Sequence, residues 1–268
     1  MANLPIVKKN TELQNINKNL SIVNRLLPTV ELQSSFNKLA WWNTLSQGWK
    51  CAFWGELNIS EIEFNKKPDF YLEKLFNTTT ELWFDYELVD FYKIQDISPL
   101  GNLTQLTTLI FWGECQIQDI SALGNLIKLK KLHLSENKIQ NISSLGNLTQ
   151  LTSLDLEYNQ IQDISVLRHL TQLISLDLRH NQIQDISVLS NLIQLTELNL
   201  LGNEIQGISA LRHLTQLISL DLGRNQIQDI SPLGTLENLE TLHLGGNPIS
   251  QPNIDWLQSK LPNCWIIY

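Results

Sequence analysis

The sequence predicts an α/β fold, a right-handed solenoid in which short repeats stack with parallel β-strands on one face and short helical turns on the other. The first observation is a leucine that recurs every 22 residues over 129–239. The second is the alternation LxL after that leucine, which is typical of a half-buried strand. A fixed period of roughly 20–50 residues is typical of stacked repeat architectures, so the period decides the fold class.

Regular repeats fill 129–238, and each follows the pattern LxxLxLxxNxI before a segment such as DISxL. A unit at 106–128 carries one extra residue within FWGECQI, and an altered unit begins at 239. A single repeat cannot bury its own leucines, so its neighbours supply the rest of the core. A unit of 22 residues leaves no room for a long helix opposite the strand, and we expect 3₁₀-like turns there.

The pattern LxxLxLxxNxI, repeated over roughly 94–268, resembles the leucine-rich repeat family. The IxDISxL half resembles the short bacterial repeats of internalins and of phosphatase-regulator-type proteins. The resemblance implies strands on a concave face, short turns on a convex face, and binding of a protein partner without catalysis.

An asparagine follows the strand segment of each regular repeat, and Cys115 takes its place in the unit at 106–128. An amide both donates and accepts hydrogen bonds, so it can satisfy turn backbone groups that would otherwise be buried without partners. The column consists of Asn137, Asn159, Asn181, Asn203, Asn225 and Asn247.

The segment DIS opens most of the convex turns, and its Asp or Ser can cap the helical turn that follows. In two units a proline comes next, Pro99 and Pro232, as expected for the first helical position.

The two ends depart from the repeat. Residues 1–80 are predicted as a helical, aromatic-rich N-terminal cap with helices over 13–27, 36–54 and 68–76, and four of the eight tryptophans lie between 41 and 54. The repeats are predicted over 81–248, with a degenerate first unit. A C-terminal helix-plus-strand cap is predicted over 249–268, where a period of 22 places Cys264 and Ile266 at the core positions of a last strand. Alternatively, 1–80 is a separate partner-binding module with an exposed tryptophan patch.

Composition excludes several classes of function. The net charge of −8 argues against a protein that binds nucleic acid, because such proteins concentrate Lys and Arg. The cysteines Cys51, Cys115 and Cys264 are widely spaced and predict neither a disulfide framework nor a zinc site. The start lacks an apolar leader and no apolar run of membrane-spanning length occurs. We therefore expect a cytoplasmic monomer without cofactor, metal or membrane contact.

Within LxxLxLxxN the positions between the leucines face the concave surface. The central position carries Asp155 and Asp177 on adjacent strands, where paired carboxylates could raise one pKa or hold a cation. Aspartate is also ordinary at this position in the resembling family, so a solvated polar column is the favoured interpretation. The arginine and histidine of RHLTQLISLDL, which occurs at 168–178 and 212–222, fall on the convex side, away from its aspartate.

The positions just before the asparagine vary most between otherwise near-identical repeats. Tyr, Trp and Arg are side chains that anchor interfaces, so this variation indicates a partner surface. Neutral drift on a surface without function is the alternative. The predicted contact residues are Trp112, Glu157, Tyr158, Arg179, His180, Leu201 and Arg224.

The sequence therefore predicts a non-catalytic scaffold that binds a protein partner through the concave face. Three alternatives stay open: binding through the helical segment at 1–80, a cation-binding or enzymatic role of Asp155 and Asp177, and a self-assembling structural protein.

Overall fold

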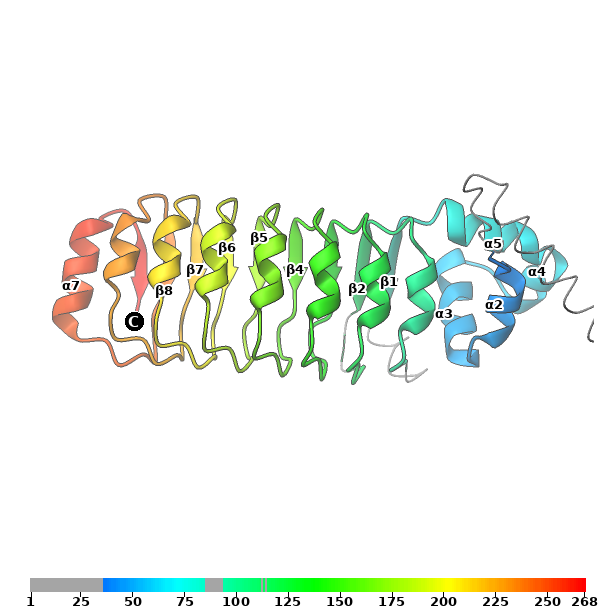
Figure 1. Ribbon diagram of the computed structural model, residues 1–268, viewed down its shortest axis with the longest axis horizontal. Coiled ribbons are helices and arrows are strands. Elements are labelled where there is room, and N and C mark those ends of the chain that lie inside the picture. The colour runs from blue at the N-terminus through cyan, green and yellow to red at the C-terminus, as the bar shows by residue number, and fades with distance from the viewer. Residues whose placement is uncertain (1–35, 85–93, 112, 114) are drawn as a thin grey trace, which may run out of the picture. The chain divides into compact units, whose positions relative to one another are not determined.

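The computed structural model describes residues 36–84, 94–111, 113 and 115–268, and the helix predicted over 13–27 lies outside them. Residues 39–268 belong to one compact unit. In this unit the repeats stack in chain order, each contributing one strand, and a 3₁₀ turn lies between successive strands from β1 to β8 (Figure 1). The predicted solenoid of parallel strands and short turns is confirmed.

One sheet of nine strands runs through the described residues, in chain order and with every neighbouring pair parallel. Equivalent leucines of successive repeats pair, as Leu132 does with Leu154 and Leu154 with Leu176. The sheet is open, so its two outer strands lie at free edges. The strands are β1 (Glu81–Phe84), β2 (Thr108–Phe111), β3 (Lys131–His133), β4 (Ser153–Asp155), β5 (Ser175–Asp177), β6 (Glu197–Asn199), β7 (Ser219–Asp221), β8 (Thr241–His243) and β9 (Trp265–Ile267).

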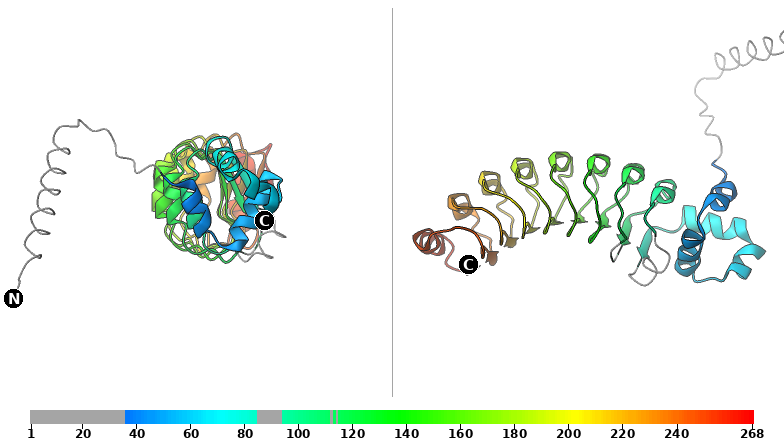
Figure 2. Two further views of the ribbon diagram at one scale, coloured as in Figure 1. Left: turned by 90° about the vertical axis from the view of Figure 1, so that its right-hand side faces the viewer. Right: turned by 90° about the horizontal axis from the view of Figure 1, so that it is seen from below.

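The 3₁₀ turns lie on the outer side of the curve that the repeats follow, and the strands lie on its inner side (Figure 2). The strand face is therefore concave, as predicted. The turns are η1 (Ser98–Asn102), η2 (Ser121–Asn125), η3 (Ser143–Asn147), η4 (Ser165–His169), η5 (Ser187–Asn191), η6 (Ser209–His213) and η7 (Ser231–Thr235).

The aspartate of DIS starts the convex turn. Oδ1 of Asp163 accepts a hydrogen bond from the backbone N–H of Ser165 at 2.8 Å, and Asn141 makes the same bond to Ser143. This bond lowers the pKa of Asp163, because it stabilises the charged carboxylate. The N-cap residue itself is an isoleucine without a side-chain bond, so the aspartate one residue earlier, rather than the serine, holds the first N–H of the turn. Pro99 and Pro232 lie in the first turn of η1 and η7, at the second residue rather than the predicted first.

The asparagine column ties each repeat to the one before it. Nδ2 of Asn159 donates to the carbonyls of Leu156, in its own repeat, and of Leu134, in the preceding repeat, at 3.1 and 3.0 Å. Its Oδ1 accepts from the backbone N–H of Ile139 at 2.9 Å. The side chain is buried, so it satisfies three backbone groups that water does not reach. The predicted role of this column is confirmed.

Cys115 occupies the asparagine position in the unit at 106–128 and is buried. Its Sγ donates to the carbonyl of Gly113 at 3.3 Å, a bond within its own repeat. Burial raises the pKa of the Cys115 thiol to about 12, so the side chain stays neutral and behaves as a small apolar group.

Helices precede the sheet. The stretch predicted as one helix over 36–54 forms two, because Ser46 caps the backbone N–H of Trp49 and starts a new helix there. A helix that was not predicted from the sequence begins after Ser60, where Ser60 and Glu63 form a capping box. The helices are α2 (Lys38–Thr44), α3 (Gln47–Leu57), α4 (Glu61–Lys66) and α5 (Pro68–Asn77).

The four tryptophans between 41 and 54 are buried. Trp49 reaches the sheet: its ring contacts Phe84 of β1 edge-on at 5.6 Å, and its Nε1 donates to the carbonyl of Asp96 at 2.8 Å. Aromatic contacts of this kind join α3 to the first strand and cover the end of the repeat core.

The C-terminal end of the repeat stack consists of the helix α7 (Gln251–Lys260) and the last strand, β9. The ring of Trp256 lies against Gly234 of η7, where an added Cβ would come within 2.8 Å of it. The predicted register of the last strand is wrong by two residues, because Ile266 pairs with Leu242 rather than with Leu244. The ten-residue helix replaces a five-residue turn and lengthens the terminal unit.

The asparagine column yields a stability prediction. Asn159→Ala leaves the buried N–H of Ile139 without its partner and removes one of the two amide donors from each of the carbonyls of Leu134 and Leu156, which keep Asn137 and Asn181. We expect the free energy of unfolding, measured by urea denaturation, to fall by about 3 kcal/mol. The matched control is Gln162→Ala, which removes an exposed hydrogen bond to Gln182 and should change stability by less than about 0.5 kcal/mol. Equal losses in the two variants would contradict this role of the column.

Candidate functional site

The concave face is built from strand residues that point away from the leucine core. The pairing of the strands places equivalent residues of successive repeats side by side, so each position forms a column across the sheet. The first column reads Glu81, Thr108, Lys131, Ser153, Ser175, Glu197, Ser219, Thr241 and Trp265. The central column reads Trp83, Ile110, His133, Asp155, Asp177, Asn199, Asp221, His243 and Ile267.

A tryptophan stands on this face near each end of the sheet. Trp83 of β1 is 50% exposed and Trp265 of β9 is 69% exposed. The sequence interpretation of tryptophans as seals for the ends therefore describes the buried group at 41–54 but not these two. They are aromatic surface that faces the same side as the polar columns.

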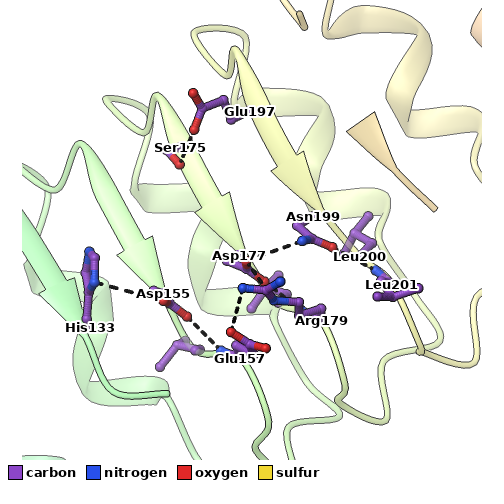
Figure 3. Close-up of polar contacts among 12 residues, drawn as sticks. His133, Asp155, Glu157, Ser175, Asp177, Arg179, Glu197, Asn199, Leu200 and Leu201 are labelled. Carbon is purple, nitrogen blue, oxygen red and sulfur yellow. Dashed lines mark hydrogen bonds and ion pairs between the residues drawn. The ribbon is translucent and has the colours of Figure 1, made fainter. Parts of the chain in front are cut away.

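Carboxylates and one arginine meet on β4 and β5 (Figure 3). Nη2 of Arg179 lies 2.6 Å from Oε2 of Glu157, and its Nε lies 3.1 Å from Oδ2 of Asp177. Asp155, Glu157 and Asp177 each offer an oxygen within 4.8 Å of the others. The predicted contact residues Glu157 and Arg179 are therefore an ion pair across adjacent repeats.

Burial acts against the charges of this cluster. It raises the pKa of Asp177 to about 6; the backbone N–H and guanidinium of Arg179 oppose the shift, and the neighbouring carboxylates of Asp155 and Glu157 add to it. The pKa of Glu157 is also raised, again by burial first, with Arg179 opposing. The guanidinium thus holds together carboxylates that would otherwise repel one another.

The spacing of the three carboxylates would suit a cation, and the Arg179 guanidinium already supplies one. The central aspartates also have a scaffold role. Oδ1 of Asp177 accepts from the N–H of Arg179, and Asn199 makes the equivalent bond to Leu201 in the next repeat. These contacts favour the interpretation of the column as polar scaffold over its interpretation as a metal site.

One arrangement resembles a serine–histidine–aspartate relay. Oγ of Ser153 lies 3.5 Å from Nε2 of His133, whose Nδ1 lies 3.9 Å from Oδ2 of Asp155. Both distances exceed the 2.6–3.2 Å or so of a working relay. The N–H groups of Ser153 and Leu134 bond to carbonyls of neighbouring repeats, so neither is available to an oxyanion. The geometry therefore offers no support for nucleophilic catalysis.

Tyr158 and His180 form a second pair across adjacent repeats. Their rings stack with centroids 4.1 Å apart and an angle of 11°. Both residues have positive φ, as do Arg224 and the glycines Gly202 and Gly246 at the equivalent positions. A left-handed conformation is strained for a residue with a Cβ, so these positions hold large side chains at an energetic cost. His180 also lies against Gly202, where an added Cβ would come within 2.8 Å of its Nδ1.

The remaining predicted contact residues are placed separately. Leu201 leans over Gly223 of the next repeat, and Arg224 leans over Gly246 in the same way. Trp112 lies outside the described residues. The structure thus joins Glu157 with Arg179 and Tyr158 with His180, whereas Leu201 and Arg224 belong to neither pair.

Burial, followed by the nearby Arg224 and Arg179, lowers the pKa of His180, which keeps its imidazole neutral.

No helix among the residues described here is both long and apolar enough to cross a bilayer.

Comparisons with known proteins agree with this geometry. The family model described as leucine-rich repeats in two copies matches residues 127–169, 171–213 and 215–262, half of the chain. The comparison with curated protein sequences finds no match.

Solved structures of bacterial proteins are similar to the repeats. An internalin (inlF) from Listeria monocytogenes is 37% identical with a TM-score of 0.61, and the match covers 65% of this chain and 50% of that chain. An internalin C2 from the same organism is 35% identical with a TM-score of 0.58, covering 63% and 74%. A leucine-rich repeat protein from Leptospira interrogans is 29% identical with a TM-score of 0.60, covering 64% and 45%. The match thus spans half or less of the first and third proteins.

The raised pKa of Asp177 predicts a pH dependence. The native state binds this proton more tightly than the unfolded chain, whose Asp pKa is about 3.9, so stability increases as pH falls from about 6 towards about 4. Asp177→Asn should remove this part of the increase in urea denaturation between pH 7 and pH 4. Asp163→Asn is the control. The pKa of Asp163 is lowered, so this group makes the wild type less stable as the pH falls, and the substitution should remove that decrease. Parallel pH profiles for Asp177→Asn and the wild type would contradict the assignment.

Arg179→Ala leaves the carboxylates of Glu157 and Asp177 without their counter-charge. We expect a loss of roughly 1–3 kcal/mol at pH 7, between the values for exposed and buried pairs, and a smaller loss near pH 5. Calcium should raise the Tm of this variant and leave that of the wild type unchanged. Arg224→Ala is the control on the same face, since Arg224 has no ion pair within the described residues. A Tm of the wild type that rises with calcium would instead support the alternative that Asp155 and Asp177 bind a cation.

Proposed function

Because the chain belongs to the leucine-rich repeat family, whose solenoids are typical protein-interaction scaffolds, we propose that it binds a partner protein through the concave face of its strands. The binding is non-catalytic. The arginine that lies among the carboxylates, and the long distances around His133, support this side of the proposal.

One observation carries the proposal: exposed, strained and aromatic side chains stand on this face within a scaffold that otherwise repeats. Tyr158 is 48% exposed although its positive φ would favour glycine, the residue present at the equivalent positions 202 and 246. Its ring is held by His180, so it is already oriented before a partner arrives. Oriented aromatic and arginine side chains lose little entropy on binding and anchor interfaces.

The proposed contact surface follows the C-terminal ends of strands β4 to β7. The anchors are Glu157, Tyr158, Arg179, His180, Leu201 and Arg224, with Trp112 added from the sequence. Trp265 extends the same face with aromatic surface at its far end. Residues 1–80 and 249–268 serve as caps in this proposal, and the protein acts as a monomer. A bacterial origin and a cytoplasmic location remain predictions from the sequence.

A second candidate surface lies on the N-terminal helices. Ile62 of α4 and Phe70 of α5 are exposed, and such side chains also bind partners. Phe70 contacts the ring of its chain neighbour Tyr71 edge-on at 5.2 Å, but neither side chain belongs to a pair that spans adjacent repeats, so this surface is the weaker candidate.

The experiment compares three double variants. Tyr158→Ala/Arg179→Ala removes two concave anchors, Ile62→Ala/Phe70→Ala removes the exposed helical residues, and Ile193→Ala/Arg212→Ala alters the convex face. A partner recovered by co-purification from the native host is titrated against each variant by calorimetry. We expect the concave pair to weaken binding about tenfold or more, since tyrosine and arginine anchors each contribute about 2 kcal/mol. The other pairs should bind within about twofold of the wild type.

Loss of binding in the helical pair alone would move the interface to the N-terminal helices. A chain that elutes as a large assembly in light scattering, without any partner, would favour the self-assembling alternative instead.

A further inference from the structure

The concave face of β4 to β7 is strongly acidic. Its outward positions and strand ends carry five carboxylates and two guanidiniums, those of Arg179, which pairs with two of the carboxylates, and of Arg224. The carboxylates are Asp155, Glu157, Asp177, Glu197 and Asp221. Such a row attracts cations and repels phosphate groups, which argues against a nucleic acid or an anionic membrane as the ligand.

An open hollow of about 570 Å³ continues this row at the edge of the face, lined by Gln116, Glu136, Asn137, Lys138 and Tyr158. Tyr158 is half exposed there, while His180 stacks against its ring. The Lys138 ammonium also lines the hollow, and it donates to Oε1 of Gln116 at 3.2 Å. Glu136 is exposed and near enough to Glu157 to raise its pKa.

An aromatic ring with carboxylates beside it is a typical binding site for a guanidinium or an ammonium group. The hollow provides the ring of Tyr158 together with Glu136, and the neighbouring strands provide the acidic row. Charge complementarity therefore identifies the chemistry of the ligand more narrowly than the fold does.

We infer that the partner presents an extended segment rich in arginine and lysine, which crosses β4 to β7 and places one cationic side chain in the hollow beside Tyr158. The path from β3 to β7 takes four strand spacings of about 4.8 Å, or about 19 Å. A peptide of about six residues at roughly 3.4 Å per residue covers it. This inference rests on the proposed concave-face binding and adds the chemistry of the partner.

Two triple variants with the same change in net charge test it. The concave triple is Glu136→Gln/Glu197→Gln/Asp221→Asn, and the convex triple is Asp163→Asn/Asp185→Asn/Asp229→Asn. The scaffold bonds have precedents in the chain: Asn199 makes the same backbone contact as Asp221, and Asn141 makes the same contact as Asp163. Both triples should therefore fold, which thermal melting checks.

The probe is a fluorescein-labelled arginine hexapeptide, with a glutamate hexapeptide as its counterpart, in fluorescence anisotropy at physiological salt. We expect the arginine peptide to bind the wild type, to bind the concave triple about tenfold more weakly, and to bind the convex triple within about twofold. Tyr158→Ala should also weaken it. Equal affinity for the two triples, or for the two peptides, would overturn the inference.

Selection from a library of random short peptides on the wild-type protein separates this inference from the proposed function. Enrichment of arginine and lysine, lost on the concave triple, supports both. Selected peptides without basic residues that still compete at the concave face overturn the inference and leave the proposed function standing. Selected peptides that bind Tyr158→Ala/Arg179→Ala and the concave triple as well as the wild type count against both.

Discussion

The hydrogen bonds of the buried asparagines are the interaction on which the rest of the structure depends. Each repeat must turn away from its strand inside the core, where the backbone groups of the turn have no access to water. Asn159 satisfies three of these groups at once, and two of them belong to the preceding repeat. The repeats therefore stack with a fixed offset, and the fixed offset brings equivalent side chains of neighbouring repeats side by side.

This offset explains how function can sit on a monotonous scaffold. Residues that are 22 positions apart become neighbours on the concave face. A partner therefore contacts a substituted side chain together with the equivalent side chain of the next repeat. Arg179 meets Glu157 in this way, and His180 meets Tyr158. The leucine and asparagine positions stay constant because the core requires them, while the strand surface is free to differ. The proposed contact surface is the part of the fold that the stacking constraint leaves unspecified.

The sequence predicted the solenoid, the column of asparagines and the polar concave face, because period and residue type determine them directly. The side-chain contacts depend on rotamers, which the sequence does not show. The 22-residue spacing of Arg179 and Glu157, and of His180 and Tyr158, could be read from the sequence, but the directions of these side chains could not. The exposure of Trp83 and Trp265 followed from strand register, which could have been counted. The two-residue shift of β9 could not, since it arises from the length of α7. The role of Trp112 remains a prediction.

The most direct measurement of the central claim is a photo-cross-link between the protein and its co-purified partner. A benzophenone side chain is placed in turn at Ser175 on the concave face, at Ser187 on the convex face, and at Ile62 on α4. The account predicts a cross-linked product from the Ser175 position alone. A product from the Ser187 or Ile62 position, with none from Ser175, would contradict it.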